Sequence, residues 1–173
     1  MDNATRERQI RAILRRLPPL EGAVIGVETI PGLRDRHGAA HGGAFLRERR
    51  MAFDCTRAEF PRIFVHELFH FVWRRAGNGI RRSYGDLLQS EVRARARGEL
   101  GWSAEWRKKA LIPADARLRN RPWREYCCDS FCDTAAWLYS GIRSHPEFTL
   151  ASRFRERRRD WFAKTLGAGH LSI

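Results

Sequence analysis

The sequence predicts an α+β fold in which a small antiparallel or mixed sheet packs on a helical bundle. Stretches 23–30 and 44–55 are rich in β-branched and apolar residues, which is typical of strands. Downstream, apolar residues recur at helical spacing in several segments separated by glycine and proline. A chain of 173 residues with 43% hydrophobic content is long enough to bury a core, so we expect residues 1–173 to form a single domain.

Helical periodicity and terminal glycine or proline residues set the expected boundaries of the other elements. Helices are expected at 4–17, 61–75, 83–98, 103–111, 122–141 and 149–166. The glycine-rich stretch 31–43 is expected to be a mobile loop, in which His37 and His41 are solvent histidines. Stretch 117–124 is expected to be a basic loop.

The segment 61–75 contains the motif His66-Glu67-Leu68-Phe69-His70. At 3.6 residues per turn, His66 and His70 lie one turn apart on the same helix face, where two imidazoles can bind one Zn²⁺. Glu67 lies beside them, in position to take a proton from a metal-bound water. The rest of the segment is apolar nearly all round, which predicts a buried helix, and buried histidines need partners. The motif therefore predicts a zinc site with Glu67 as general base.

A catalytic zinc commonly takes three protein ligands, so a third ligand is expected downstream. We predict Glu125, early on the helix 122–141. Asp129 follows four residues later on the same face, where it can orient a ligand histidine through a hydrogen bond. Three other glutamates remain as alternatives for the third ligand: Glu91, Glu99 and Glu105.

The stretches RIFVHELFHFV and EYCCDSFCDTAAWL resemble the two motif helices of the ImmA/IrrE family of zinc metallopeptidases. The resemblance implies His66, His70 and Glu125 as zinc ligands and Glu67 as general base. It also implies a zincin-like, more narrowly gluzincin-like, fold and a zinc-dependent endopeptidase that acts on a peptide or protein substrate.

The net charge of +13 comes mostly from arginines spread along the chain. Spread charge is typical of solvated helix faces, although a weak polyanion or nucleic-acid binding surface is the alternative. A second interpretation of the whole chain is therefore a nucleic-acid-associated regulatory protein with a structural or vestigial zinc site. A zinc hydrolase acting on a non-peptide substrate is a third.

The four cysteines do not have the pattern of a disulfide framework, because Cys127, Cys128 and Cys132 fall on one predicted helix. We expect these three to be small buried apolar residues, with thiolate ligation of a structural zinc as the alternative. The chain has no secretory signal and no run of about 20 apolar residues, so neither export nor a membrane span is expected. Together these features predict a cytoplasmic protein.

Overall fold

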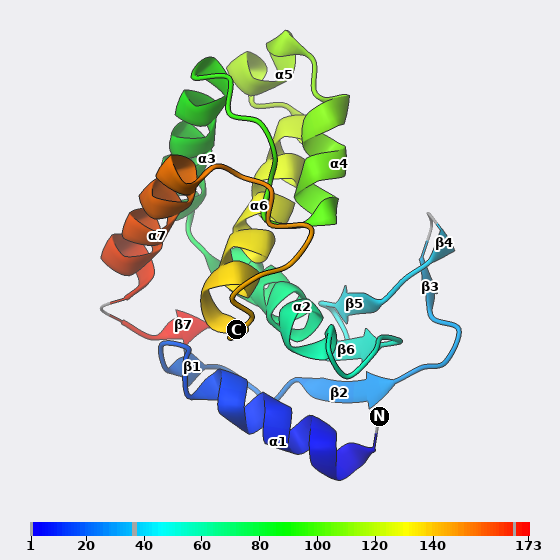
Figure 1. Ribbon diagram of the computed structural model, residues 1–173. Coiled ribbons are helices and arrows are strands. Elements are labelled where there is room, and N and C mark those ends of the chain that lie inside the picture. The colour runs from blue at the N-terminus through cyan, green and yellow to red at the C-terminus, as the bar shows by residue number, and fades with distance from the viewer. Residues whose placement is uncertain (1, 36–37, 168) are drawn as a thin grey trace.

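The computed structural model describes residues 2–35, 38–167 and 169–173, and it confirms an α+β fold with a small mixed sheet (Figure 1). His37 lies outside the described residues. The sheet lies on one side of the helix α2 (Phe60–Arg75), and most of the other helices lie on its opposite side.

The three-stranded sheet has the order β2-β6-β5, from Gly26–Thr29, Arg50–Phe53 and Gly42–Phe45. The central strand β6 pairs in parallel with β2 and antiparallel with β5. Met51, Ala52 and Phe53 of β6 are buried, so this strand joins the sheet to the core. Strand β5 is an edge strand of this sheet and lies against α2.

Two short strand pairs complete the β structure among the described residues. Strands β3 (Arg34–Asp35) and β4 (Gly38–Ala39) form an antiparallel pair where the sequence predicted a loop without strands. Strands β1 (Leu20–Glu21) and β7 (Leu171–Ser172) pair in parallel, which joins the C-terminal residues to the segment that follows α1.

The buried helix α2 begins and ends within one residue of its predicted limits. Its first turns pack on the sheet through aromatic contacts, with the ring of Phe53 lying 5.1 Å from that of Phe60 and 6.0 Å from that of Phe64. Farther along, Phe69 packs 5.7 Å from Phe131 of α6 (Arg121–Tyr139). Aromatic packing of this kind fixes how α2 and α6 cross, and hence which of their polar side chains meet.

The remaining helices surround this pair. They are α1 (Asn3–Leu14), α3 (Asn78–Arg93), α4 (Trp102–Ala110), α5 (Pro113–Leu118) and α7 (Ser152–Leu166). The prediction for α3 was wrong at its start, because only Ala76 and Gly77 separate α2 from α3, which begins at Asn78. Most of the predicted basic loop 117–124 is helical: residues 117–118 belong to α5 and residues 121–124 to α6.

A charged network lies inside the helical part and is called here the closed network: Arg158, Glu91, Glu99 and their partners Lys108 and Tyr126. The guanidinium of Arg158 donates to both Glu91 and Glu99 through bonds of 2.7 to 3.3 Å, and all three side chains are fully buried. Lys108 Nζ lies 3.0 Å from Glu99, and the Tyr126 hydroxyl donates to the same carboxylate. The network links α3, α4, α6 and α7.

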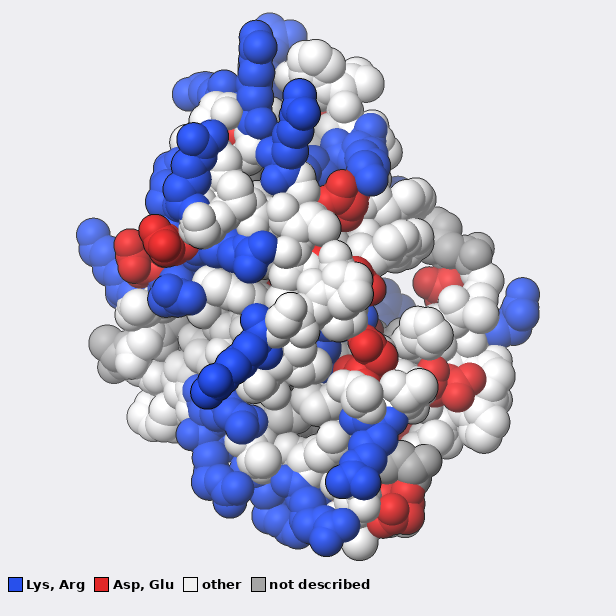
Figure 2. Space-filling model, in the orientation of Figure 1, with Lys and Arg blue, Asp and Glu red and all other residues white. Residues whose placement is uncertain are grey.

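No helix in the described ranges is long and apolar enough to cross a bilayer. Figure 2 shows basic side chains over much of one face, while acidic side chains gather near the hollow between the helices and the β3–β4 pair. Whether the basic surface binds a polyanion stays a prediction.

Candidate metal centre

His66 and His70 present their Nε2 atoms to a common point. The two nitrogens lie 3.2 Å apart, and the rings meet edge to face with centroids separated by 4.9 Å. In a tetrahedral site with Zn–N distances of about 2.05 Å, two ligand nitrogens lie about 3.3 Å apart. The histidine pair therefore has the spacing that a single zinc ion requires.

Asp129 supplies the third donor of this group. One ligand atom each from His66, His70 and Asp129 lies within 4.8 Å of the others. The Nε of Arg107 on α4 donates to Asp129 Oδ2, and Asp129 is nearly buried. A carboxylate held by one oxygen can still offer the other to a metal, so Arg107 orients Asp129 without using all of its acceptor capacity.

Asp133 holds the first histidine from behind. Its Oδ1 lies 2.7 Å from His66 Nδ1, and its Oδ2 accepts a 3.0 Å hydrogen bond from the backbone N–H of Ala104, near the start of α4. A carboxylate at Nδ1 fixes the tautomer that leaves the Nε2 lone pair free for a metal.

Burial and charge act in opposite directions on the histidines. Burial lowers the pKa of His66, but the Asp133 carboxylate outweighs it and leaves the pKa raised. Burial also lowers the pKa of His70, and the adjacent Cys128 thiolate overcomes this and raises the pKa to about 10.

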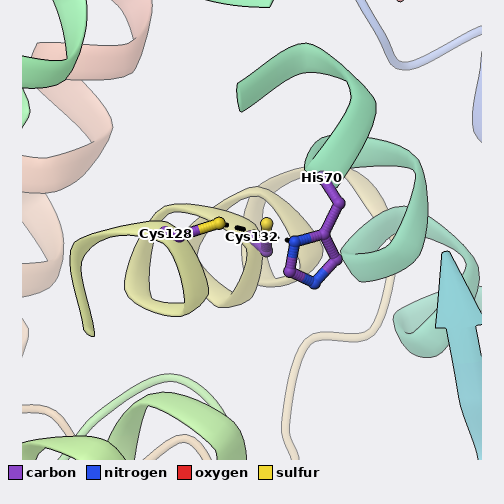
Figure 3. A group of neighbouring side chains, drawn as sticks. All are labelled: His70, Cys128 and Cys132. Atoms are coloured by element: carbon purple, nitrogen blue, oxygen red, sulfur yellow. Dashed lines mark hydrogen bonds between the residues drawn. The ribbon is translucent and has the colours of Figure 1, made fainter. Parts of the chain in front are cut away.

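His70 meets a different environment at its other nitrogen. Its Nδ1 lies 3.4 Å from Cys128 Sγ, and Cys132 lies one turn farther along α6 (Figure 3). A hydrogen bond from Cys132 and the charge of His70 lower the pKa of the Cys128 thiol to about 6. Cys127 and Cys132 are buried as predicted, but Cys128 is a polar partner of His70 as well as a packing residue.

One histidine of the pair, His66, lines a cleft of about 640 Å³. His66 and Glu67 form part of its floor, and β5 contributes Gly42 to one wall. The opposite wall carries the stacked rings of Trp102 and Trp106, whose centroids are 6.1 Å apart. Glu67 is mostly buried and lines the cleft together with His66, and its role as general base stays a prediction.

The other predicted ligands lie elsewhere. Glu125 belongs to neither group of metal donors found in the described part of the chain; it pairs with Arg107 at 2.8 Å and with Arg121 at 2.7 Å. The three alternative third ligands form ion pairs away from the histidines. Glu91 and Glu99 bind Arg158, and Glu105 pairs with Lys109. Ligation by Glu125 stays a prediction, and the structure brings Asp129 to the histidines instead.

Sequence reasoning missed Asp133, although the signal was present. Glu125, Asp129 and Asp133 repeat at four-residue spacing, so all three lie along one side of α6. The prediction assigned Glu125 and Asp129 to the site, whereas in the structure Asp129 and Asp133 approach the histidines.

Two glycines also shape the site and could not be recognised from composition. A Cβ at Gly42 would overlap Ile63 and lie 3.0 Å from Glu67 Oε1. A Cβ at Gly101 would overlap the Asp133 carboxylate. Both positions therefore require glycine for close approach of the backbone to a site carboxylate.

A scan against protein-family models, a search of curated proteins and a search of solved structures each returned no match.

Proposed function

We propose that this chain is a zinc-dependent metallopeptidase with a zincin-like active site. The observation that carries the proposal is the 3.2 Å separation of two Nε2 atoms that face each other beside a carboxylate and a cleft. Buried imidazoles whose lone pairs converge need a proton or a cation between them, and the acidic partners around them favour a cation.

His66, His70 and Asp129 would hold the metal, and Asp133 would orient His66. Bound Zn²⁺ supplies Lewis acidity, which polarises a carbonyl and lowers the pKa of a water ligand. Glu67 takes the proton of the attacking water and delivers it to the leaving amine. The resemblance to ImmA/IrrE peptidases agrees with these roles, except that the third ligand and the orienting carboxylate each lie one helical turn later.

The cleft suits an extended peptide. Strand β5 is an edge strand of its sheet, and an edge offers unpaired backbone groups to which a peptide can add as a further strand. Gly42 of this strand lines the cleft directly above Glu67, so a peptide bound there passes over the general base.

The charge of the cleft indicates which peptides bind best. Among the described residues, four carboxylates and one guanidinium line it, and that guanidinium, of Arg62, is already paired with Glu59 and Glu147. The lining carboxylates are Asp35, Glu67, Asp133 and Glu147. A cleft with this lining attracts basic peptides even though the molecule as a whole is strongly basic.

The test is metal analysis combined with hydrolysis of a peptide library. We expect about one Zn²⁺ per chain at this centre. Glu67→Gln keeps the shape of the side chain and removes the base, so zinc should stay while turnover falls about 10²–10⁴-fold. Glu7→Gln, an exposed change on α1, is the matched control and should leave turnover unchanged. Lysine- and arginine-containing peptides should have lower KM than acidic ones.

Two outcomes would contradict the proposal. If the protein takes up no zinc on reconstitution, the proposed metal centre is wrong. A zinc-loaded protein that hydrolyses no peptide, yet binds DNA or RNA with an affinity that falls steeply with salt, would favour the regulatory alternative.

A further inference from the structure

Helix α6 carries two parallel rows of metal-binding side chains. The stretch Cys128-Asp129-Ser130-Phe131-Cys132-Asp133 places two thiols four residues apart and two carboxylates four residues apart. Successive residues point about 100° apart around a helix, so the thiol row and the carboxylate row lie side by side on α6. The carboxylate row belongs to the centre described above.

The thiol row meets the opposite edge of the same histidine. His70 Nε2 faces His66, whereas His70 Nδ1 faces Cys128 Sγ at 3.4 Å. One donor atom each from His70, Cys128 and Cys132 lies within 4.8 Å of the others (Figure 3). An ion about 2.3 Å from a thiolate and about 2.05 Å from a nitrogen leaves those two ligand atoms about 3.6 Å apart. The observed spacing of nitrogen and sulfur is thus close to that of a tetrahedral site.

We propose that His70, Cys128 and Cys132 form a second metal position, selective for soft, thiophilic cations such as Cd²⁺. Soft thiolate ligands favour such cations, while the nitrogen and carboxylate donors on the other side of His70 form a harder site. A divalent ion bound by two thiolates and one neutral imidazole forms a complex without net charge, which suits the buried interface of α2 and α6. Binding releases the protons that the sulfur and Nδ1 atoms carry.

The two positions exclude each other. A neutral imidazole has one lone pair, so a cation at Nδ1 leaves a proton on Nε2, which points at His66. Occupation of the thiol position therefore withdraws His70 from the histidine pair. A thiophilic cation bound there would therefore inhibit hydrolysis. This inhibition rests on the proposed function, whereas the existence of the second metal position does not.

The experiment is a Cd²⁺ titration of the full chain, followed by the ultraviolet charge-transfer absorption that sulfur–cadmium bonds produce and nitrogen–cadmium or oxygen–cadmium bonds do not. Wild type should show the band, and Cys128→Ser should lose most of it. Cys127→Ser is the matched control, because Cys127 is the adjacent residue but belongs to neither donor group. Asp129→Asn should keep the band, since that residue serves only the harder site.

Cadmium NMR of the unmodified protein gives an answer even if a variant fails to fold, because sulfur ligands shift the cadmium resonance strongly downfield. A wild-type resonance typical of nitrogen and oxygen ligands alone, or an unchanged band in Cys128→Ser, would overturn the second position. Two cations bound at once with both signatures would overturn the exclusion. A sulfur band in a protein that hydrolyses no peptide would leave this position standing while the proposed function fails.

Discussion

Helix α6 takes part in two groups of buried charged side chains, and the two are built differently. On one face, Tyr126 joins the closed network, where Arg158 donates to two carboxylates and Lys108 reaches one of them. On another face, Asp129 and Asp133 approach His66 and His70, whose Nε2 atoms face each other.

The difference lies in how each group is completed. In the closed network two cationic and two anionic side chains balance, and protein donors meet the carboxylates. In the metal centre the converging atoms are acceptors, so a proton or an ion from solution must complete it. Buried charge alone is therefore a poor guide to function; what distinguishes the candidate site is that its two imidazole nitrogens face each other and that His66 and Asp133 line a cleft.

The largest effect should come from breaking the closed network. Arg158→Met leaves Glu91 and Glu99 buried without their main partner, so unfolding free energy should fall by about 3–5 kcal/mol, measured by urea denaturation. Arg159→Met, the exposed neighbour on α7, should change it by about 0.5 kcal/mol or less. Similar losses in both variants would show that the network is not the source of the stability.

A smaller effect should separate the two candidates for the third ligand. Asp129→Ala removes a donor from the histidine group and should weaken zinc binding by more than the roughly 10–100-fold that orienting residues contribute. Glu125→Ala removes a partner of Arg107 and Arg121 but no member of the histidine group, so it should weaken zinc binding by about 10-fold at most. Affinities come from competition with a chromophoric chelator. The reverse order would restore Glu125 as the ligand.

Asp133→Asn should have a still smaller effect on the metal centre. The amide can still meet His66 but without charge, so zinc affinity should fall about 10–100-fold, which corresponds to about 1.4–2.8 kcal/mol. The zinc affinity should also lose part of its dependence on pH, because the raised pKa of His66 comes from the Asp133 charge. Unchanged affinity across pH 6–8 in the variant and the wild type alike would contradict this role.

The contribution of the closed network to the free energy of unfolding should decrease gradually as the pH is lowered. Burial raises the pKa of Glu99, but Arg158 outweighs it and leaves the pKa below the ordinary value of 4.5. The stability that this carboxylate provides is therefore complete above about pH 4.5 and is lost as pH falls through its pKa in the folded protein. Glu99→Gln should flatten the stability curve below that pH. A curve with the wild-type slope would assign acid unfolding to other groups.

The parts of the site that depend on local interactions were predictable from the sequence, and those that depend on contacts between distant segments were not. His66, Glu67 and His70 were placed correctly relative to one another because a helix fixes their spacing locally. Glu125, Asp129 and Asp133 have identical spacing along α6, so which of them meets the histidines depends on how α6 crosses α2. That crossing is set by long-range aromatic packing, which the local pattern does not encode.

The fold shows the same division. Helix α2 was predicted closely, because an apolar run with Pro61 marks it within its own sequence. The short strands β1, β3, β4 and β7 were not predicted, because two-residue strands form through pairing with distant or opposing segments rather than through propensity. The turn at Gly77 is a similar case: Gly77 and Gly79 indicated that a helix ends here, but not how many residues separate it from the next helix.

The Asp133 carboxylate connects the cleft wall formed by α4 to the candidate metal ligand His66. One oxygen of its carboxylate bonds to His66, and the other accepts the N–H of Ala104, so it also caps α4 from a different helix. Helix α4 carries Trp102 and Trp106 into the cleft. Asp133 thus links the start of α4 directly to His66. If the proposed metal binds, a ligand that holds α4 in place would strengthen metal binding, and by reciprocity the metal would strengthen binding of that ligand.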